Sequence, residues 1–287
     1  MIPALCLRGG TVADNGLAGK AMASDFDGTL FFGVGNRVHP FHRFLSRDLA
    51  AIADFRARGG LFGVCTGRPL GAVLEDASDT LSFDFAITSS GACVSDGAGN
   101  TLFSRGIDYD DVQAILETAH GPAARPPFLA MRSGYFVLGG TKIPGLSKAF
   151  LRQLKVAGSV DEALSMAPES DNGEVQVVSL GFASQRHASD FAAKVGDLLG
   201  ERVAAFQNVD TVDVVPAGCS KGAGLAVARE RLGLGLVGGI GDSFNDLPLI
   251  EEADVGYTFN RAPEDVRAGA QVLVDDVAGA LADLVRR

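Results

Sequence analysis

Ala21-Met22-Ala23-Ser24-Asp25-Phe26-Asp27-Gly28-Thr29-Leu30, residues 21–30, is the stretch of sequence that decides the fold. It begins with four mostly apolar residues, which is typical of the end of a buried strand, and two carboxylates then follow two positions apart. A carboxylate at the end of a strand can be a nucleophile, a metal ligand or an acid/base. Gly28 lets the backbone turn and offer N–H groups to an anion. Taken alone, the segment is equally consistent with a solvated polar turn.

Alternating strand and helix patterns follow this stretch. A helix is predicted over 46–58, with Ser46 as its N-cap and Gly59-Gly60 ending it. Apolar strands are predicted at 61–65 and 84–88, with a further helix between them. Because this order is β-α-β-α-β, it indicates a parallel sheet covered by helices.

The same alternation returns in the last quarter of the chain. A helix is predicted over 220–232, strands at 234–240 and 254–258, and a later helix with Pro263 in its first position. Two halves that are distant in sequence are therefore expected to form one sheet. The predicted fold class is α/β, with a Rossmann-like parallel sheet as its core.

The middle of the chain has a different character, in which short strands and helices mix. A hairpin is predicted around Gly97-Ala98-Gly99, and a helix is predicted over 146–156. This mixture indicates an inserted α+β domain. We therefore predict a core made of residues 1–91 and 216–287 and an inserted cap domain made of residues 92–215.

Composition and charge exclude several classes of partner. The 287 residues carry a net charge of −10, which argues against nucleic acid or an anionic membrane as the main partner. No apolar run approaches the roughly 20 residues that span a bilayer, and the N-terminus lacks the pattern of a signal peptide. The isolated cysteines form no CxxC pair, so we expect a reduced, cytoplasmic protein. It is expected to be a monomer or a homodimer.

Polar motifs follow or flank the predicted α/β elements at four places. They are Asp25-x-Asp27-Gly28-Thr29, Thr66-Gly67-Arg68, Lys221-Gly222 and Gly241-Asp242-x-x-Asn245-Asp246. Ligand sites in open parallel sheets lie beyond the carboxyl ends of the strands, so we expect the motifs to converge there. Singly, each has an ordinary interpretation: a helix cap, a solvated lysine or a charged helix start.

Together the four motifs supply what phosphoryl transfer needs. They contain a candidate nucleophile, a second carboxylate, hydroxyl and amide donors, a lysine and an acid able to bind a cation. Much of the catalysis of phosphoryl transfer comes from placing positive charge and hydrogen-bond donors around the transferring group. Mg²⁺ prefers oxygen ligands, so carboxylates and a substrate phosphate would suit it.

The same motifs, in the same order, resemble those of the haloacid dehalogenase superfamily. The finer similarity is to its Cof-like branch, subclass IIB, in which a large cap lies between the second and third motifs. The segment 260–266 resembles the Asn-Ala-Pro-Glu segment of that branch, with Arg261 inserted. The chain departs from the branch at Ser90-Gly91-Ala92, where Asn-Gly-Ala is common, and this segment bears on substrate choice.

The resemblance implies a hydrolase that acts on phosphate monoesters through an aspartyl-phosphate. Asp25 would attack phosphorus, and Asp27 would protonate the leaving alcohol and then activate water. Mg²⁺ would be held by the carboxylates of Asp25 and Asp242 and by the backbone carbonyl of Asp27. The cap would line the leaving-group side of the crevice.

The resemblance also implies how the phosphoryl group is bound. Thr66 and the backbone of Asp27 and Gly28 would hold its oxygens, while Lys221 would neutralise the nucleophile and the phosphate. Asn245 would contact the phosphate. Asp246 would lie behind these groups and orient Lys221 or a metal-bound water.

The leading hypothesis is therefore a Mg²⁺-dependent phosphatase of small phosphorylated metabolites, with sugar phosphates favoured. A sugar phosphomutase would share the nucleophile and the cap class, and it would isomerise a sugar phosphate without releasing phosphate. A catalytically silent binding protein on the same scaffold is a third hypothesis. It is weakened because Asp25, Asp27, Thr66, Lys221 and Asp242 are all present.

Overall fold

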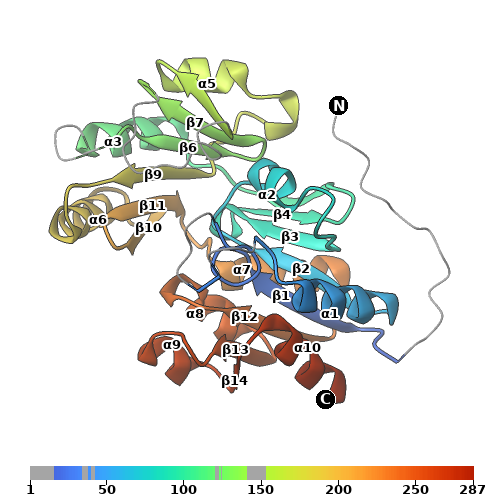
Figure 1. Cartoon of the computed structure of the whole chain (residues 1–287). Helices are drawn as coiled ribbons and strands as arrows, with labels where there is room; N and C mark the ends of the chain where they lie inside the picture. Colours follow the sequence, from blue (N-terminus) through green and yellow to red (C-terminus); the bar gives the residue numbers. More distant parts are fainter. Residues whose placement is uncertain (1–15, 34–37, 40–42, 120–122, 124, 141–152) are drawn as a thin grey trace. The chain divides into compact units, whose positions relative to one another are not determined.

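The computed structural model describes residues 16–33, 38–39, 43–119, 123, 125–140 and 153–287, and it contains two compact units (Figure 1). The first unit takes its described residues from 1–67, 77–103 and 220–287. The second takes them from 68–76 and 104–219.

The first unit is built on an eight-stranded sheet. In chain order its strands are β1 (Lys20–Asp25), β2 (Leu61–Cys65), β3 (Phe85–Thr88), β4 (Cys93–Asp96), β5 (Thr101–Ser104), β12 (Leu236–Gly241), β13 (Val255–Phe259) and β14 (Val272–Val274). Their order in the sheet is β14-β13-β12-β1-β2-β3-β4-β5. The strands from β14 to β3 are parallel, and β4 is antiparallel to β3. The predicted α/β fold class is confirmed.

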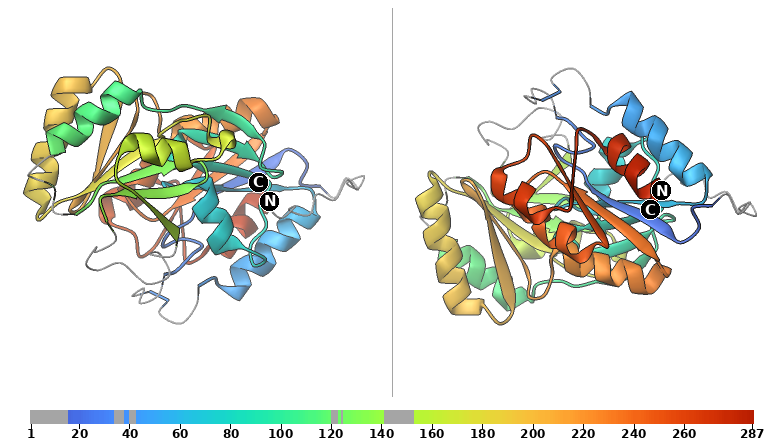
Figure 2. Two further views of the ribbon diagram at one scale, coloured as in Figure 1. Left: turned by 90° about the horizontal axis from the view of Figure 1, so that it is seen from above. Right: turned by 90° about the horizontal axis from the view of Figure 1, so that it is seen from below.

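Helices cover both faces of this sheet. They are α1 (Ser46–Ala57), α7 (Lys221–Leu232), α8 (Leu247–Glu252), α9 (Glu264–Gly269) and α10 (Val277–Arg286), with 3₁₀ turns η1 (Ser89–Gly91) and η3 (Phe244–Asp246). Helices α1 and α10 pack on each other, as do α7 and α8, and α8 also packs on β12 (Figure 2). The central strand β1 is therefore buried from Ala21 to Asp25, which explains its nearly continuous apolar run.

The second unit has a six-stranded sheet with the order β10-β11-β9-β6-β7-β8. Its elements are α2 (Leu70–Ala77), α3 (Tyr109–Ala119), β6 (Phe128–Met131), β7 (Gly134–Leu138), β8 (Leu154–Ala157), α5 (Val160–Met166), η2 (Glu169–Asp171), β9 (Val177–Gly181), α6 (Gln185–Leu199), β10 (Val203–Asn208) and β11 (Thr211–Pro216). Its described strand pairs are antiparallel except for β7 and β8, and its core lies between the sheet and α3 and α6.

The boundaries between the two units differ from those expected from the sequence, where the insert was predicted to run from residue 92 to residue 215. The hairpin β4–β5, which we assigned to the insert, continues the first sheet through β3, so the change of unit falls after Phe103. Most of α2 groups with the second unit because its backbone touches the β6–β7 turn: the Gly71 amide donates to the carbonyl of Arg132 at 2.9 Å. Arg68 and Asp76, which form an ion pair with an N–O distance of 2.6 Å, also belong to the second unit.

Three local predictions were wrong. Of the helix predicted over 146–156, Gln153 is helical but residues 154–156 form part of a strand, because β8 pairs with the edge of β7; residues 146–152 lie outside the described part of the chain. The N-cap of α1 is Leu45, and Ser46 is already helical. Pro263 is the N-cap of α9 and does not lie in its first turn. The strand β14 and the helices α5 and α10 were not predicted.

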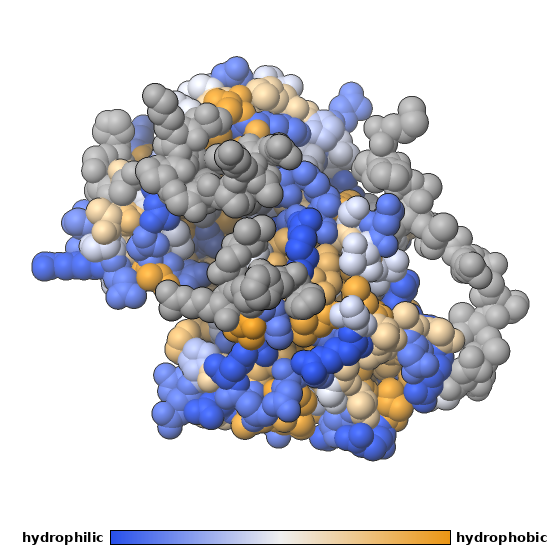
Figure 3. Space-filling model, viewed as in Figure 1, coloured by the Kyte–Doolittle hydropathy of each residue, from blue (hydrophilic) through white to orange (hydrophobic). Residues whose placement is uncertain are grey.

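No described helix is long and apolar enough to cross a membrane. On the face seen in Figure 3, hydrophilic residues are interspersed among hydrophobic ones. Cys65, Cys93 and Cys219 are buried and unpaired, and Cys6 lies outside the described residues.

Candidate active site

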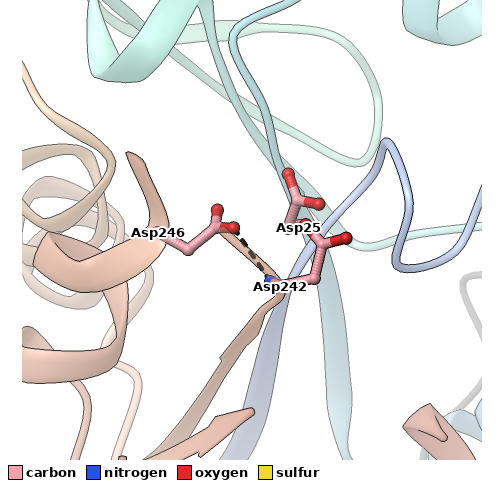
Figure 4. A group of neighbouring side chains, drawn as sticks. All are labelled: Asp25, Asp242 and Asp246. Carbon is pink, nitrogen blue, oxygen red and sulfur yellow. Dashed lines mark hydrogen bonds between the residues drawn. The ribbon is translucent and has the colours of Figure 1, made fainter. Parts of the chain in front are cut away.

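Three neighbouring parallel strands of the first unit bring predicted site residues to one edge of the sheet. Asp25 ends β1, Thr66 directly follows β2 and Asp242 directly follows β12. The registers pair Asp25 with Cys65 and Ser24 with Ile240, so the three strands end at the same level. Figure 4 shows Asp25, Asp242 and Asp246 gathered at this edge.

Lys221 joins this group from the first turn of α7. Ser220 caps the helix, its side chain accepting a hydrogen bond from the Ala223 amide, and Lys221 is only 3% exposed. Its Nζ donates to Asp25 Oδ1 at 2.6 Å and also to Asp246 Oδ1. Burial tends to lower the pKa of Lys221, but Asp246 and Asp25 together raise it above its ordinary value, so the side chain is a fixed cation.

Asp246 is fully buried and has both carboxylate oxygens occupied. Oδ1 accepts from Lys221, while Oδ2 accepts from the backbone amides of Asp242 and Ser243, each at 3.0 Å. Ser243 Oγ, whose single proton is shared with Asn245 Oδ1, also lies 3.1 Å from Oδ2. This is a capping box at the start of η3, and one of its bonds is drawn in Figure 4. Asp246 therefore anchors both Lys221 and the segment that carries Asp242.

Asp25 differs from Asp246 in having one oxygen without a partner. Its carboxylate is buried, and Oδ2 makes no hydrogen bond among the described residues. Burial raises the pKa of Asp25 well above its ordinary value and Asp246 raises it further, whereas Lys221 lowers it. A buried carboxylate oxygen without a partner is costly, so the site is built to receive a ligand or a reacting atom there.

Asp25, Asp242 and Asp246 each offer a carboxylate oxygen within 4.8 Å of the other two. Burial, and next the charge of Asp246, raise the pKa of Asp242 to about 6. Crowded carboxylates of this kind can hold a divalent cation. Because both oxygens of Asp246 already have donors, Asp25 and Asp242 are the two carboxylates better placed to bind one.

The turn after Asp25 lies directly against Asp242. Gly28 has a φ of +81°, and a Cβ atom there would lie 2.5 Å from Asp242 Oδ2, so any other residue would be strained and would push Asp242 aside. The turn is closed by hydrogen bonds from Gly28 N to the Phe31 carbonyl and from Leu30 N to the Phe26 carbonyl. Asp27 is exposed, in contrast to Asp25.

Thr66 is buried, and its backbone joins β2 to η1. Its amide donates to the Ile87 carbonyl at 2.8 Å, and its carbonyl accepts from Ser90 N at 3.0 Å. Ser89 and Ser90 both have positive φ, which is uncommon outside glycine and costs roughly 1–3 kcal/mol per residue. At Gly91 a Cβ would lie 2.0 Å from the Ser220 carbonyl, so η1 also touches the start of α7.

Asn245 is exposed at η3, and its side-chain oxygen accepts from Ser243 Oγ at 2.6 Å. The structure thus brings Asp25, Lys221, Asp242 and Asp246 together, with Gly28 and Thr66 beside them, whereas Asn245 and Asp27 lie at the solvent-facing side. The left-handed serines of η1 and the contact of Arg261 with this site were not predicted. A serine carries no sequence signal for positive φ, and Arg261 was noticed only as an unusual residue in its segment.

Comparison with known proteins gives matches over nearly the whole chain. The family model for haloacid dehalogenase-like hydrolases matches residues 22–279. A protein named HMP-PP phosphatase from Citrobacter koseri is 28% identical over 254 residues, covering 85% of each chain. Another of that name from Escherichia fergusonii is 26% identical over 253 residues, covering 87% of each chain.

Solved structures share the fold at lower identity. A sugar phosphatase described as HAD subclass IIB superposes with a TM-score of 0.73 at 21% identity, covering 93% of this chain and 98% of its own. A haloacid dehalogenase-like hydrolase from Bacteroides thetaiotaomicron superposes with a TM-score of 0.74 at 19% identity, with the same coverage. The fold that the motif resemblance implied is thereby confirmed.

Proposed function

This chain belongs to the family of haloacid dehalogenase-like hydrolases, and we propose that it is a Mg²⁺-dependent phosphatase of small phosphorylated metabolites. The predicted enzyme class, a hydrolase of phosphate monoesters, agrees with this family and with its phosphatase-named relatives. The observation that carries the proposal is Asp25, whose Oδ1 is held by Lys221 while the buried Oδ2 has no partner among the described residues.

In the proposed reaction, Asp25 Oδ2 forms a bond to phosphorus while the bond from phosphorus to the ester oxygen breaks. Asp27, which is exposed, gives its proton to the departing alkoxide and then takes a proton from the water that attacks the aspartyl-phosphate. Lys221 stays protonated throughout and offsets the negative charge of the phosphoryl group. Thr66, the Asp27 backbone and Asn245 are the proposed donors to the phosphoryl oxygens. The Gly28 amide, which was also expected there, donates to the Phe31 carbonyl within the turn.

The residues of the site fit a divalent cation. Asp25 Oδ1, which leaves Oδ2 for phosphorus and has a second lone pair beside the Lys221 hydrogen bond, and the nearby carboxylate of Asp242 are oxygen donors of the kind that Mg²⁺ prefers. We assign the backbone carbonyl of Asp27 as a third. A bound cation would supply positive charge that offsets the crowding of these carboxylates with the substrate phosphate. Asp246 is better suited to holding Lys221 and the Asp242 backbone in place.

Sugar phosphates are the favoured substrates, and the relatives named HMP-PP phosphatase add HMP-PP to the compounds to be tested. The three free, buried cysteines of the described chain support a reducing, cytoplasmic setting.

The test is release of inorganic phosphate from a panel of sugar phosphates and HMP-PP by wild-type protein, with Mg²⁺ and with excess EDTA. We expect hydrolysis with Mg²⁺ and its loss with EDTA. Asp25→Asn should abolish turnover. Asp54→Asn, which makes the same change on the exposed face of α1, should leave turnover unchanged.

Full activity of Asp25→Asn would overturn the proposed nucleophile. A parallel assay for isomerised sugar phosphate separates the mutase: isomerisation without phosphate release would replace the phosphatase hypothesis. A protein that binds the panel and turns over nothing would support the silent binding protein.

A further inference from the structure

Arg261 reaches the turn that follows the proposed nucleophile. It lies between β13 and α9, and its Nη2 donates to the carbonyl of Gly28 at 2.7 Å, although the two residues are 233 positions apart in sequence. Its guanidinium carbon lies 3.7 Å from the centre of the Phe259 ring, and Phe259 is 1% exposed. Arg261 is itself exposed, but its guanidinium is stacked on a buried ring of the core and one of its nitrogens donates to a backbone oxygen of the turn.

The same turn also lies against Asp242. Gly28 approaches Asp242 so closely that a single added carbon would clash with Oδ2 at 2.5 Å. Gly28 therefore contacts both the guanidinium of Arg261 and the carboxylate of Asp242. Burial lowers the pKa of Arg261 and the charge of Asp242 raises it, which places the two charges within each other's field.

We propose that Arg261 is a positioning residue that fixes the turn Asp27–Gly28–Thr29 against Asp242 and so sets the geometry of the cation site. The inference rests on the proposed function, in which this turn supplies a carbonyl ligand and the acid/base. Glycine is permissive at a φ of +81°, and the hydrogen bond from Gly28 N to the Phe31 carbonyl ties Gly28 only to its own turn. The bond from Arg261 ties it to a distant part of the chain. A charge-assisted hydrogen bond from a stacked, planar donor is stronger and more directional than a neutral one, and it can supply this restraint.

The restraint affects alignment more than substrate affinity. Displacing a reacting group by 1 Å can cost about 10²-fold in rate. Removal of the Arg261 hydrogen bond should therefore lower kcat and loosen Mg²⁺ binding while leaving KM nearly constant. A role through charge alone predicts the opposite for the cation, because removing a positive charge beside Asp242 would tighten Mg²⁺ binding.

The test compares Arg261→Met, which keeps the aliphatic stem, with Arg261→Gln, which keeps an amide donor for the Gly28 carbonyl. Arg267→Met is the matched control, because it removes an exposed arginine from α9, in the same segment. Mg²⁺ affinity is measured by titration calorimetry on the substrate-free protein. The values of kcat and KM are measured with p-nitrophenyl phosphate at saturating Mg²⁺.

We expect Arg261→Met to weaken Mg²⁺ binding and to lower kcat by about 10-fold or more, with KM changed by less than about 3-fold. Arg261→Gln should recover most of both losses, and Arg267→Met should behave as wild type. Unchanged or tighter Mg²⁺ binding in Arg261→Met, or no recovery in Arg261→Gln, would overturn the inference. If wild-type protein itself binds no Mg²⁺ or hydrolyses no ester, the failure lies in the proposed function.

Discussion

Lys221→Met should make the stability of this protein depend on pH and on Mg²⁺. Lys221 is the cation between two buried carboxylates, Asp25 and Asp246. Its replacement by an apolar side chain of similar length leaves both carboxylates without that partner. Asp246 keeps the amides of Asp242 and Ser243 as donors, whereas Asp25 keeps no donor among the described side chains.

The size of the effect follows from the geometry. At 2.6 Å, the Lys221–Asp25 pair has a Coulomb energy of about 6 kcal/mol at an effective dielectric constant near 20. Part of this energy is offset by the cost of taking both charges out of water. Breaking a buried pair by removing one partner typically costs about 3–5 kcal/mol. We expect Lys221→Met to lose this much of the free energy of unfolding at pH 7.5.

Urea unfolding followed by circular dichroism, at several pH values, measures the loss. Lys194→Met on the exposed face of α6 is the matched control. The loss should shrink as the pH falls toward 5, because a carboxylate that has lost its cation takes up a proton. Mg²⁺ should stabilise Lys221→Met more than wild type, since it restores positive charge beside Asp25.

A double variant tests whether part of the lost free energy of unfolding comes from the contact between Lys221 and Asp246. Adding Asp246→Asn to Lys221→Met should cost less than the sum of the two single changes, because the two side chains are in contact. The reasoning fails if Lys221→Met loses no more stability than Lys194→Met, or if its loss is the same at pH 5 and pH 7.5.

Two further changes test other parts of the site and its support. Gly28→Ala should lower the free energy of unfolding by about 1–2 kcal/mol, because alanine is strained at positive φ. It should also abolish phosphate release, because the added Cβ would clash with Asp242. Wild-type activity in the purified variant would contradict the close contact between Gly28 and Asp242. Burial raises the pKa of Asp48 to about 6. The folded protein therefore keeps the Asp48 carboxyl protonated up to about pH 6, whereas the unfolded chain loses that proton above about pH 4, so the free energy of unfolding falls as the pH rises from about 4 to 6. Asp48 Oδ1 accepts a hydrogen bond from the Ala278 amide at 2.9 Å, and the side-chain oxygen of Asp48→Asn can accept the same bond. Asp48→Asn should raise the free energy of unfolding at pH 7.5 by up to about 3 kcal/mol and leave it unchanged at pH 3.5. An equal change at both pH values would show that ionisation of Asp48 is not the cause.

Local patterns in the sequence predicted the strands and helices of the sheet core well. The strand predicted at 61–65 is β2, and the helix predicted over 220–232 is α7, which begins at Lys221. Errors occur where a non-local contact outweighs local preference. Residues 154–156 were predicted as the end of a helix but pair with the edge of β7, and the hairpin β4–β5 belongs to the first sheet because it pairs with β3.

The sequence by itself determined the order of the polar motifs and their places at strand ends, because both follow from local periodicity and from the rule for parallel sheets. That was sufficient to identify the family and the kind of reaction. Tertiary structure alone decided which oxygen of Asp25 is left without a partner, because that depends on Lys221, 196 positions away. It also decided that Arg261 meets Gly28, because contacts across 233 positions arise only when the parallel strands align side by side.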